Sequence, residues 1–188
     1  GWNAGYLERE PEKVVKELSM LIDTYNPRMF VCRDNSINGA NLLEFCSSFK
    51  NHNNPWAAMA RADLSDKEID SLQRSGCQFI YFGLESGSDR VLSENNKGIG
   101  IKQMSRFIRT LYDHDIMPAP SIFVGSPDET EGEFEKTTKF ILDHKDYLDI
   151  INLYPYMMSP ASDFSLMEKK PHGNTLTRLK RMISLCVD

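Results

Sequence analysis

The sequence is poor in cysteine, with four among its 188 residues, and none of the four lie close together. Cys32 and Cys46, the nearest two, are 14 positions apart, whereas zinc sites and dithiol redox motifs need pairs such as C-x-x-C. This spacing excludes both kinds of site, and we expect no metal ligands in this chain. Cys32 lies in an apolar run and Cys46 on the apolar side of a predicted helix, which is typical of buried reduced thiols. We therefore expect a cytoplasmic protein.

Membrane-length and strongly basic segments are also missing. No apolar run approaches the roughly 18 residues of a membrane span, and the opening GWNAGYLEREPEK lacks the apolar core of a signal peptide. The net charge of −5 argues against a broad nucleic-acid-binding surface. No G-x-x-x-x-G-K-[ST] phosphate loop or Ser-His-Asp arrangement is present. His52, His114 and His144 fall at the ends of predicted helices, where surface roles suffice.

Strand-like and helix-like patterns alternate along the chain. Apolar runs typical of strands occupy 28–33, 56–60, 78–84, 118–125 and 148–156. Helical patterns occupy 11–25, 38–49, 65–76, a stretch from about 88, 101–113, 129–145 and 174–187. This alternation predicts an α/β fold in which helices cover a parallel sheet. Five such units without a linker indicate a barrel or part of one, in a single domain over residues 1–188.

Polar residues follow the predicted strands. Asp34, Arg61 and Glu85 each come where a strand ends, and in parallel barrels ligands bind at this carboxyl edge. A glutamate there can accept two hydrogen bonds from a diol such as a ribose, and Gly83 and Gly87 leave room for close approach. Alternatives stay open, because Glu85 could cap the following helix, and Asp34 and Arg61 could pair with each other.

Two motifs resemble the radical S-adenosylmethionine (SAM) enzymes. They are the run RADLSDKEIDSLQRSGCQFIYFGLESGSDRVLSENNKG and the later IFVGSPDET, and the upstream AGYLEREPEKVVKEL is similar to the segment after the cluster-binding loop of that family. The resemblance extends from about Gly5 to Ser162. It is strongest to the subgroup that often carries an N-terminal cobalamin-binding domain. It implies a partial parallel (β/α) barrel of the radical SAM type with about five strands.

The resemblance also implies residues that bind SAM. Glu85 matches the polar residue that binds the SAM ribose, and Lys97 matches the basic residue that pairs with the SAM carboxylate. Ser121 falls where another ribose contact often lies. Asp34 occupies roughly the place of the acidic residue that meets the methionine amino group.

Further positions follow from the same resemblance. Phe123, Val124 and Gly125 would line the adenine through backbone and apolar contacts. Arg61 would face the substrate side of the cavity. Pro160-Ala161-Ser162 stands where many relatives have Pro-Gly-Thr. No catalytic residue is assigned.

The family's C-x₃-C-x₂-C loop is absent. In the family this loop ligates three irons of a [4Fe–4S] cluster and leaves the fourth iron open for SAM. We expect the loop to precede Gly1 in a longer parent protein, so that this chain is the central to C-terminal part of the barrel and is inactive alone. The alternative is a natural relative that has lost the cluster.

The resemblance implies an enzyme whose parent cleaves SAM to a 5′-deoxyadenosyl radical and modifies an unknown substrate, with an electron donor for the cluster. It leaves open whether cobalamin takes part. The alternative is a non-catalytic SAM- or nucleotide-binding module. An unrelated barrel lyase or aldolase would need a catalytic lysine or a metal cluster at a strand exit, and the sequence shows neither.

Overall fold

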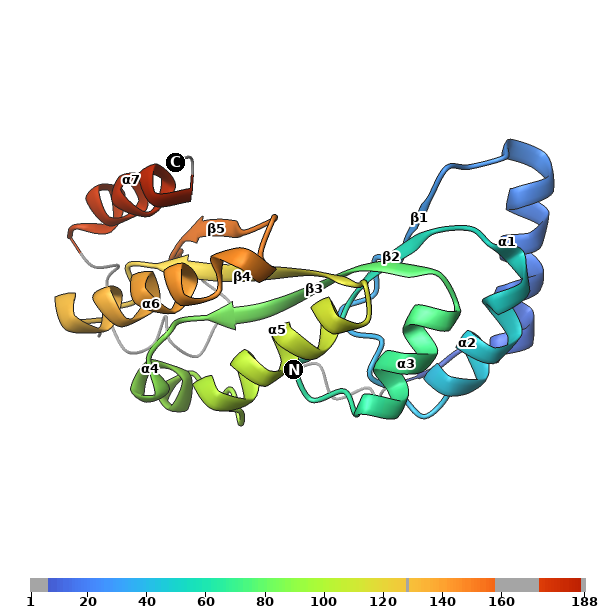
Figure 1. Ribbon diagram of the computed structural model, residues 1–188, viewed down its shortest axis with the longest axis horizontal. Coiled ribbons are helices and arrows are strands. Elements are labelled where there is room, and N and C mark those ends of the chain that lie inside the picture. Colours follow the sequence, from blue (N-terminus) through green and yellow to red (C-terminus); the bar gives the residue numbers. More distant parts are fainter. Residues whose placement is uncertain (1–6, 128, 158–172, 187–188) are drawn as a thin grey trace.

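A computed structural model describes residues 7–127, 129–157 and 173–186 of the chain (Figure 1). The strands are β1 (Phe30–Val31), β2 (Trp56–Met59), β3 (Cys77–Glu85), β4 (Met117–Val124) and β5 (Asn152–Pro155). The helices are α1 (Pro11–Tyr25), α2 (Leu42–Phe49), α3 (Asp66–Arg74), α4 (Asp89–Glu94), α5 (Ile101–Asp113), α6 (Glu131–Asp143) and α7 (Thr175–Cys186), with 3-10 turns η1 (Lys50–His52) and η2 (Lys145–Tyr147). Strands and helices alternate as the sequence predicts.

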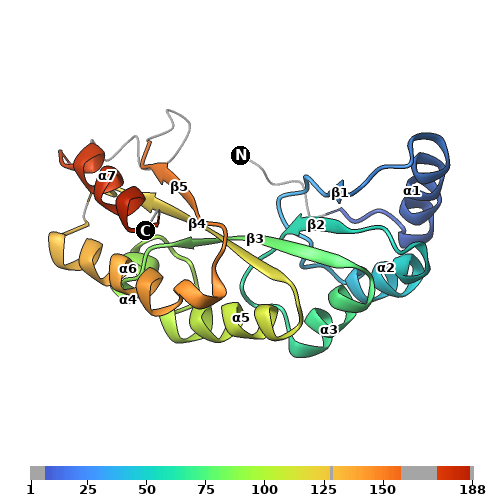
Figure 2. The ribbon, with the colours of Figure 1, turned by 45° about the horizontal axis from the view of Figure 1, so that its top comes forward.

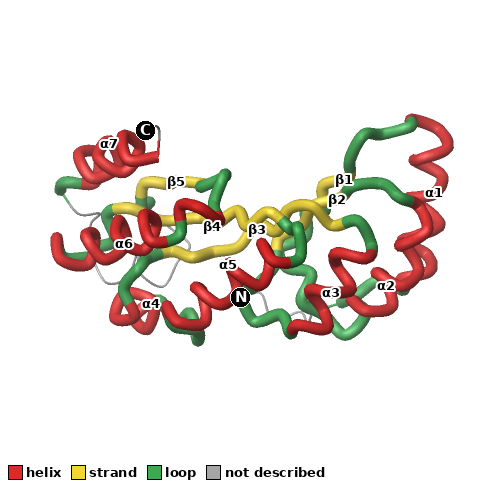
Figure 3. Tube along the Cα trace, viewed as in Figure 1, coloured by secondary structure: helices red, strands yellow, loops and turns green. Residues whose placement is uncertain are grey.

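The five strands form one sheet in the order β1-β2-β3-β4-β5, and every neighbouring pair is parallel. Helices α2, α3, α5 and α6 lie along one face of this curved sheet (Figure 2). The predicted partial parallel (β/α) barrel is confirmed. In the part of the chain that the structure describes, no helix crosses the opposite face over β2 and β3 (Figure 3).

The two faces of the sheet differ because successive strand residues point to opposite sides. Ile80, Phe82 and Leu84 of β3 are buried against the helices. Tyr81 and Gly83 point to the other face and are only half-buried. The first face therefore holds the core, and the second is available to ligands.

Local signals place several helix ends as predicted. Pro11 is the first residue of α1, a position where the missing N–H costs nothing. Ser65 and Glu68 form a capping box at the start of α3, and Gly76, with a φ of 86°, follows the end of that helix.

Other boundaries differ from the prediction. Helix α2 begins at Leu42 instead of residue 38, and just before it the carboxylate of Glu8 accepts hydrogen bonds from the N–H groups of Ala40 and Asn41. The strand expected over 28–33 has only two paired residues. No helix in the described ranges is both long and apolar enough to cross a membrane.

The expected surface role of His144 is wrong. Its side chain is buried between α5 and α6, where the ring stacks on Phe140 and Nε2 lies 2.7 Å from Oγ of Ser105. Nδ1 lies 2.8 Å from the Phe140 carbonyl oxygen, which can only accept, so the proton is on Nδ1 and Nε2 accepts from Ser105. His144 therefore joins two helices of the covering layer.

Candidate functional site

Strand β3 ends in a bulge that carries Glu85. The pairing register with β4 shifts between Gly83 and Glu85, and Glu85 has a left-handed φ of 64°. A side chain other than glycine in this region costs on the order of 1 kcal/mol and occurs where surrounding contacts hold it. The bulge turns the Glu85 side chain back over Gly83, toward the open face of the sheet.

Glu85 and Lys97 form an ion pair over this face. Nζ of Lys97 donates to Oε1 of Glu85 at 2.9 Å, and the side chains are 26% and 19% exposed. Lys97 is brought there by α4 and the turn after it, in which the Lys97 N–H bonds to the carbonyl of Leu92. Two of the residues that the resemblance links to SAM are therefore in direct contact.

One oxygen of Glu85 has no partner. Oε2 is buried and accepts no hydrogen bond from any described residue. An unsatisfied buried acceptor costs about 1–3 kcal/mol, more for a charged group. Glu85 therefore keeps one acceptor oxygen that the described residues do not satisfy.

Neutral side chains surround the pair on the same face. Ser121 of β4 is paired with Gly83, and Asn152 of β5 is paired with Ser121. Further along, the rings of Phe123 and Tyr154 are 5.9 Å apart, and both side chains are exposed. The face can therefore offer hydroxyl, amide and aromatic contacts beside one carboxylate and one ammonium group.

The side chain of Val124 and the N–H of Gly125 do not face the open side of the sheet as Phe123 does. The Val124 side chain is buried on the helix side of the sheet, and its carbonyl accepts from the N–H of Tyr156. The N–H of Gly125 donates to Glu129 at 3.1 Å. Of the three residues expected at the adenine, only Phe123 presents its side chain to the open face.

Asp34 and Arg61 are not part of this constellation. Asp34 accepts a hydrogen bond from the Cys32 thiol and lines a pocket of about 500 Å³ between α1, α2 and β1. Arg61 pairs with Asp63 at 2.9 Å, so the expected alternative of an Asp34–Arg61 pair is wrong. Within the described residues, neither forms a hydrogen bond or ion pair with Glu85.

The glycine-serine turn after Glu85 packs on α6. A Cβ at Gly87 would lie 2.5 Å from Cα of Thr137, and the Gly87 N–H donates to Thr137 Oγ1 at 2.8 Å. The expectation that Gly87 makes room for a ligand is wrong, because α6 occupies that space. Gly83 instead leaves room for the Glu85 carboxylate and the Lys97 ammonium group.

The PDET segment is partly a helix start. Thr130 and Glu133 form a capping box for α6, and Glu133 also binds Arg90 of α4, which lowers its pKa to about 2. Asp128 lies outside the described residues. Glu129 instead makes a buried ion pair with Arg178 of α7. Sequence reasoning missed this pair, since the partners are 49 residues apart and share no local motif.

The described cysteines do not fit an iron–sulfur cluster. Burial raises the pKa of Cys46 to about 11 and that of Cys77 further, so in the metal-free protein both are thiols at neutral pH. Burial also raises the pKa of Cys32, which is half-buried. Among the described residues no group of three or more Cys, His, Asp or Glu could hold a metal ion. The expected Pro160-Ala161-Ser162 site lies outside these residues.

Comparison with known proteins finds radical SAM proteins by both sequence and structure. A model of the radical SAM superfamily matches residues 5–141. The chain is 30% identical over 134 residues to an uncharacterized methyltransferase of Pyrococcus horikoshii, a match that covers 69% of this chain and 29% of that protein. It is 28% identical over 165 residues to the anaerobic magnesium-protoporphyrin IX monomethyl ester cyclase of Rubrivivax gelatinosus, covering 84% of this chain and 29% of the cyclase. The chain thus spans about three tenths of the length of these relatives.

A solved structure shares the fold. The radical SAM methyltransferase TsrM from Kitasatospora setae, with cobalamin and a [4Fe–4S] cluster bound, matches with a TM-score of 0.70 at 14% identity. The match covers 79% of this chain and 29% of TsrM. At this identity the likeness concerns the fold alone.

Proposed function

The chain belongs to the radical SAM superfamily, and on that premise we propose that the open face around Glu85 and Lys97 binds SAM. The carrying observation is the Glu85 carboxylate: a left-handed bulge holds its Oε1 over Gly83, and its Oε2 has no hydrogen-bond partner among the described residues. A ribose hydroxyl supplies the donor that this oxygen lacks.

The other residues would each contact a different part of the SAM molecule. Lys97 would attract the carboxylate of the methionine part, exchanging one carboxylate partner for another. Ser121, next to Gly83 in the pairing, would contact the ribose, and Phe123 would cover the adenine with its exposed ring. The N–H of Gly125 is already bonded to Glu129, so it is not free to bind SAM. Gly125 would therefore act through the shape of the loop.

Asp34 and Arg61 keep only peripheral roles in this proposal. Asp34 stands at the end of β1, at the rim of the same carboxyl edge, where the amino group of SAM would be its partner. Arg61, held by Asp63, would meet the substrate at that rim. Both proposals rest on position in the sheet rather than on contact with Glu85.

We further propose that the parent protein is an enzyme whose [4Fe–4S] cluster is ligated by residues outside this chain, since the described cysteines do not fit it. SAM and the reduced cluster, when bound together, supply one-electron chemistry that the protein positions and shields from water. Relatives named as methyltransferases and a cyclase support such a role without fixing the substrate. The cobalamin bound to TsrM supports a cobalamin-assisted reaction as the next candidate.

The deciding experiment is Glu85→Gln in the cluster-loaded parent protein, with SAM affinity and thermal stability both measured. A charge-assisted hydrogen bond is worth roughly 1.5–3 kcal/mol, so affinity should fall about ten- to a hundredfold. Glu68→Ala, which removes the side-chain acceptor of the α3 capping box, is the control and should lower stability without changing SAM affinity. If Glu85→Gln melts earlier but binds SAM as the parent does, Glu85 is a structural residue and the proposal fails.

A second measurement separates an enzyme from a non-catalytic binding module. Iron content and the thiolate-to-iron absorbance band are measured after anaerobic reconstitution of the parent and of residues 1–188. We expect the cluster in the parent alone. A parent that binds SAM but holds no cluster would be the non-catalytic module.

A further inference from the structure

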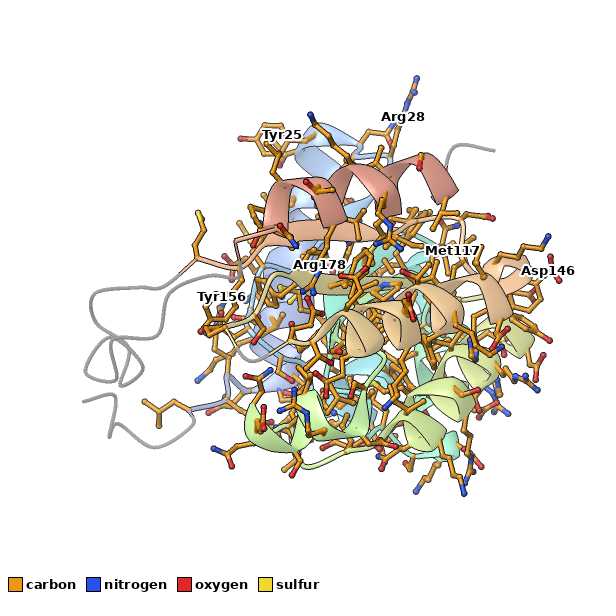
Figure 4. All side chains as sticks on the ribbon, turned by 90° about the vertical axis from the view of Figure 1, so that its left-hand side faces the viewer. Tyr25, Arg28, Met117, Asp146, Tyr156 and Arg178 are labelled. Atoms are coloured by element: carbon orange, nitrogen blue, oxygen red, sulfur yellow. The ribbon has the colours of Figure 1, made fainter. Side chains whose placement is uncertain are left out.

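A fully buried arginine lies at the start of the last described helix. Arg178 of α7 is 2% exposed, and it lies between α7 and α6 (Figure 4). Burying a charged guanidinium is costly unless partners satisfy it.

The partners of Arg178 come from the segment that follows β4. Nη1 donates to Oε2 of Glu129 at 2.9 Å and to the Glu129 carbonyl at 3.1 Å. Nε and Nη2 donate to Oε2 of Glu131 at 3.2 and 3.1 Å, and the guanidinium lies over the Phe134 ring at 5.3 Å. The arginine thus joins α7 to the start of α6 through one buried and one exposed carboxylate.

Glu129 links Arg178 to the turn after β4. The same Oε2 that binds Arg178 also accepts from the N–H of Gly125 at 3.1 Å. Burial raises the pKa of Glu129, while the Gly125 N–H and Arg178 oppose this effect. Both groups therefore favour the ionised carboxylate, which is the stronger acceptor for Gly125.

Helix α7 holds Gly125 from a second direction. Gly125 has a φ of 86°, and a Cβ there would lie 1.9 Å from Oγ1 of Thr175, the first residue of α7. The turn after β4 is therefore enclosed between Glu129 and α7. This turn begins two residues after Phe123, whose exposed ring is on the open face.

We propose that Arg178 is a positioning residue for SAM: through Glu129 it fixes the Gly125 turn and, with it, the adenine side of the site. The inference rests on the proposed function. It makes α7 part of the support of the cofactor site rather than an outer helix.

The first test needs no ligand. Hydrogen exchange of the Gly125 amide is measured in the parent protein and in Arg178→Met. Without the guanidinium, the Glu129 carboxylate loses its fixed position, and we expect Gly125 to exchange at least tenfold faster. The matched control is Arg181→Met, because Arg181 also lies over Phe134 and pairs with Glu131 but is half exposed and does not reach Glu129. It should leave Gly125 exchange within twofold of the parent.

The second test measures SAM affinity in the same proteins, well below their melting temperatures. We expect Arg178→Met to bind SAM about tenfold more weakly, Arg181→Met to match the parent, and Arg178→Lys, whose ammonium can still meet Glu129, to lie between them. If Arg178→Met does not fold, Arg178→Lys carries both tests and should raise Gly125 exchange and weaken SAM binding at least threefold.

Two results would overturn the inference. Gly125 exchange that stays at the parent rate in the Arg178 variants would show that Arg178 does not hold the turn. Faster exchange with parental SAM affinity would show that the turn does not matter for binding; if Glu85→Gln still weakens SAM in the same assay, the proposed function stands and only the positioning role is lost.

Discussion

The carboxylate of Glu85 occupies the space that a side chain at Gly83 would need. A Cβ built on Gly83 would lie 2.1 Å from Oε1 of Glu85 and 2.6 Å from Nζ of Lys97. Glu85 reaches this position because its left-handed φ and the register shift turn the chain at the end of β3. The glycine and the bulge therefore act together to place an ion pair over the sheet.

Gly83→Ala should disturb the ligand site more than the fold. The new methyl group must displace the Glu85–Lys97 pair, whose side chains are flexible at their ends, so we expect SAM affinity to fall at least tenfold in the parent protein. The free energy of unfolding should fall by about 1–3 kcal/mol, the usual cost of overpacking. Calorimetric SAM titration and urea denaturation measure the two effects. Parental affinity in this variant would show that the pair does not contact SAM.

Gly87→Ala should act on stability, since its new methyl group meets the backbone of α6. The nearest atoms are Cα and N of Thr137, at 2.5 and 2.8 Å, and backbone moves less readily than a side-chain end. We expect a loss of about 1–3 kcal/mol in the free energy of unfolding, measured by urea denaturation. Gly132→Ala is the control, because nothing lies within 4 Å of that position; it should be neutral or slightly stabilising. Equal behaviour of the two variants would argue against the close contact.

Glu133 should make stability depend on acid pH. Arg90 lowers its folded pKa to about 2 from an ordinary value near 4.5, so its contribution is complete above about pH 4.5 and is lost as the pH falls toward 2. Glu133→Gln should cost roughly 1.5–3 kcal/mol at pH 7. The difference between parent and variant should shrink steadily from pH 4.5 to pH 3. Glu135→Gln, on an exposed position of the same helix, should show no such change, and a gap that is constant down to pH 3 would contradict the assignment.

Cys46 and Cys77 should resist thiol reagents in the folded protein. With a pKa of about 11, only about one Cys46 in a thousand is a thiolate at pH 8, and both side chains are buried. We expect native labelling by an aromatic disulfide reagent to be over a hundredfold slower than in denaturant, with labelled peptides identified by mass. Similar rates in native and unfolded protein would show that these thiols are accessible.

Local chemistry explains why much of the fold could be predicted. The capping box of Ser65 and Glu68, the proline at position 11 and the glycine at position 76 act within a few residues of themselves, so the printed sequence contains the whole signal. The alternation of apolar strands and helices likewise predicts that the sheet is parallel. Glu85 and Lys97 could be assigned to one SAM site because the family motif contains both, whereas their ion pair is seen only in the structure.

The rest depends on contacts between distant segments. Nothing near Arg178 in the sequence indicates that it is buried against Glu129, and nothing near Asp34 indicates that it lines a pocket between α1, α2 and β1. Gly87 seemed to leave room for a ligand because its neighbour in space, Thr137, is 50 residues away. Such contacts depend on how the helices pack against the sheet. That packing cannot be read from the pattern of a single sequence.

The strand order has a consequence for synthesis on the ribosome. Each strand pairs with the strand made just before it, as Phe30 with Trp56 and Ser121 with Asn152, so no strand must await a remote segment. The sheet can grow from one edge as the nascent chain emerges, at roughly 5–20 residues per second. Arg178 follows all five strands. The turn at Gly125 therefore cannot contact α7 until that helix has left the ribosome. Translation thus sets the order in which the sheet and then the Gly125 turn become rigid.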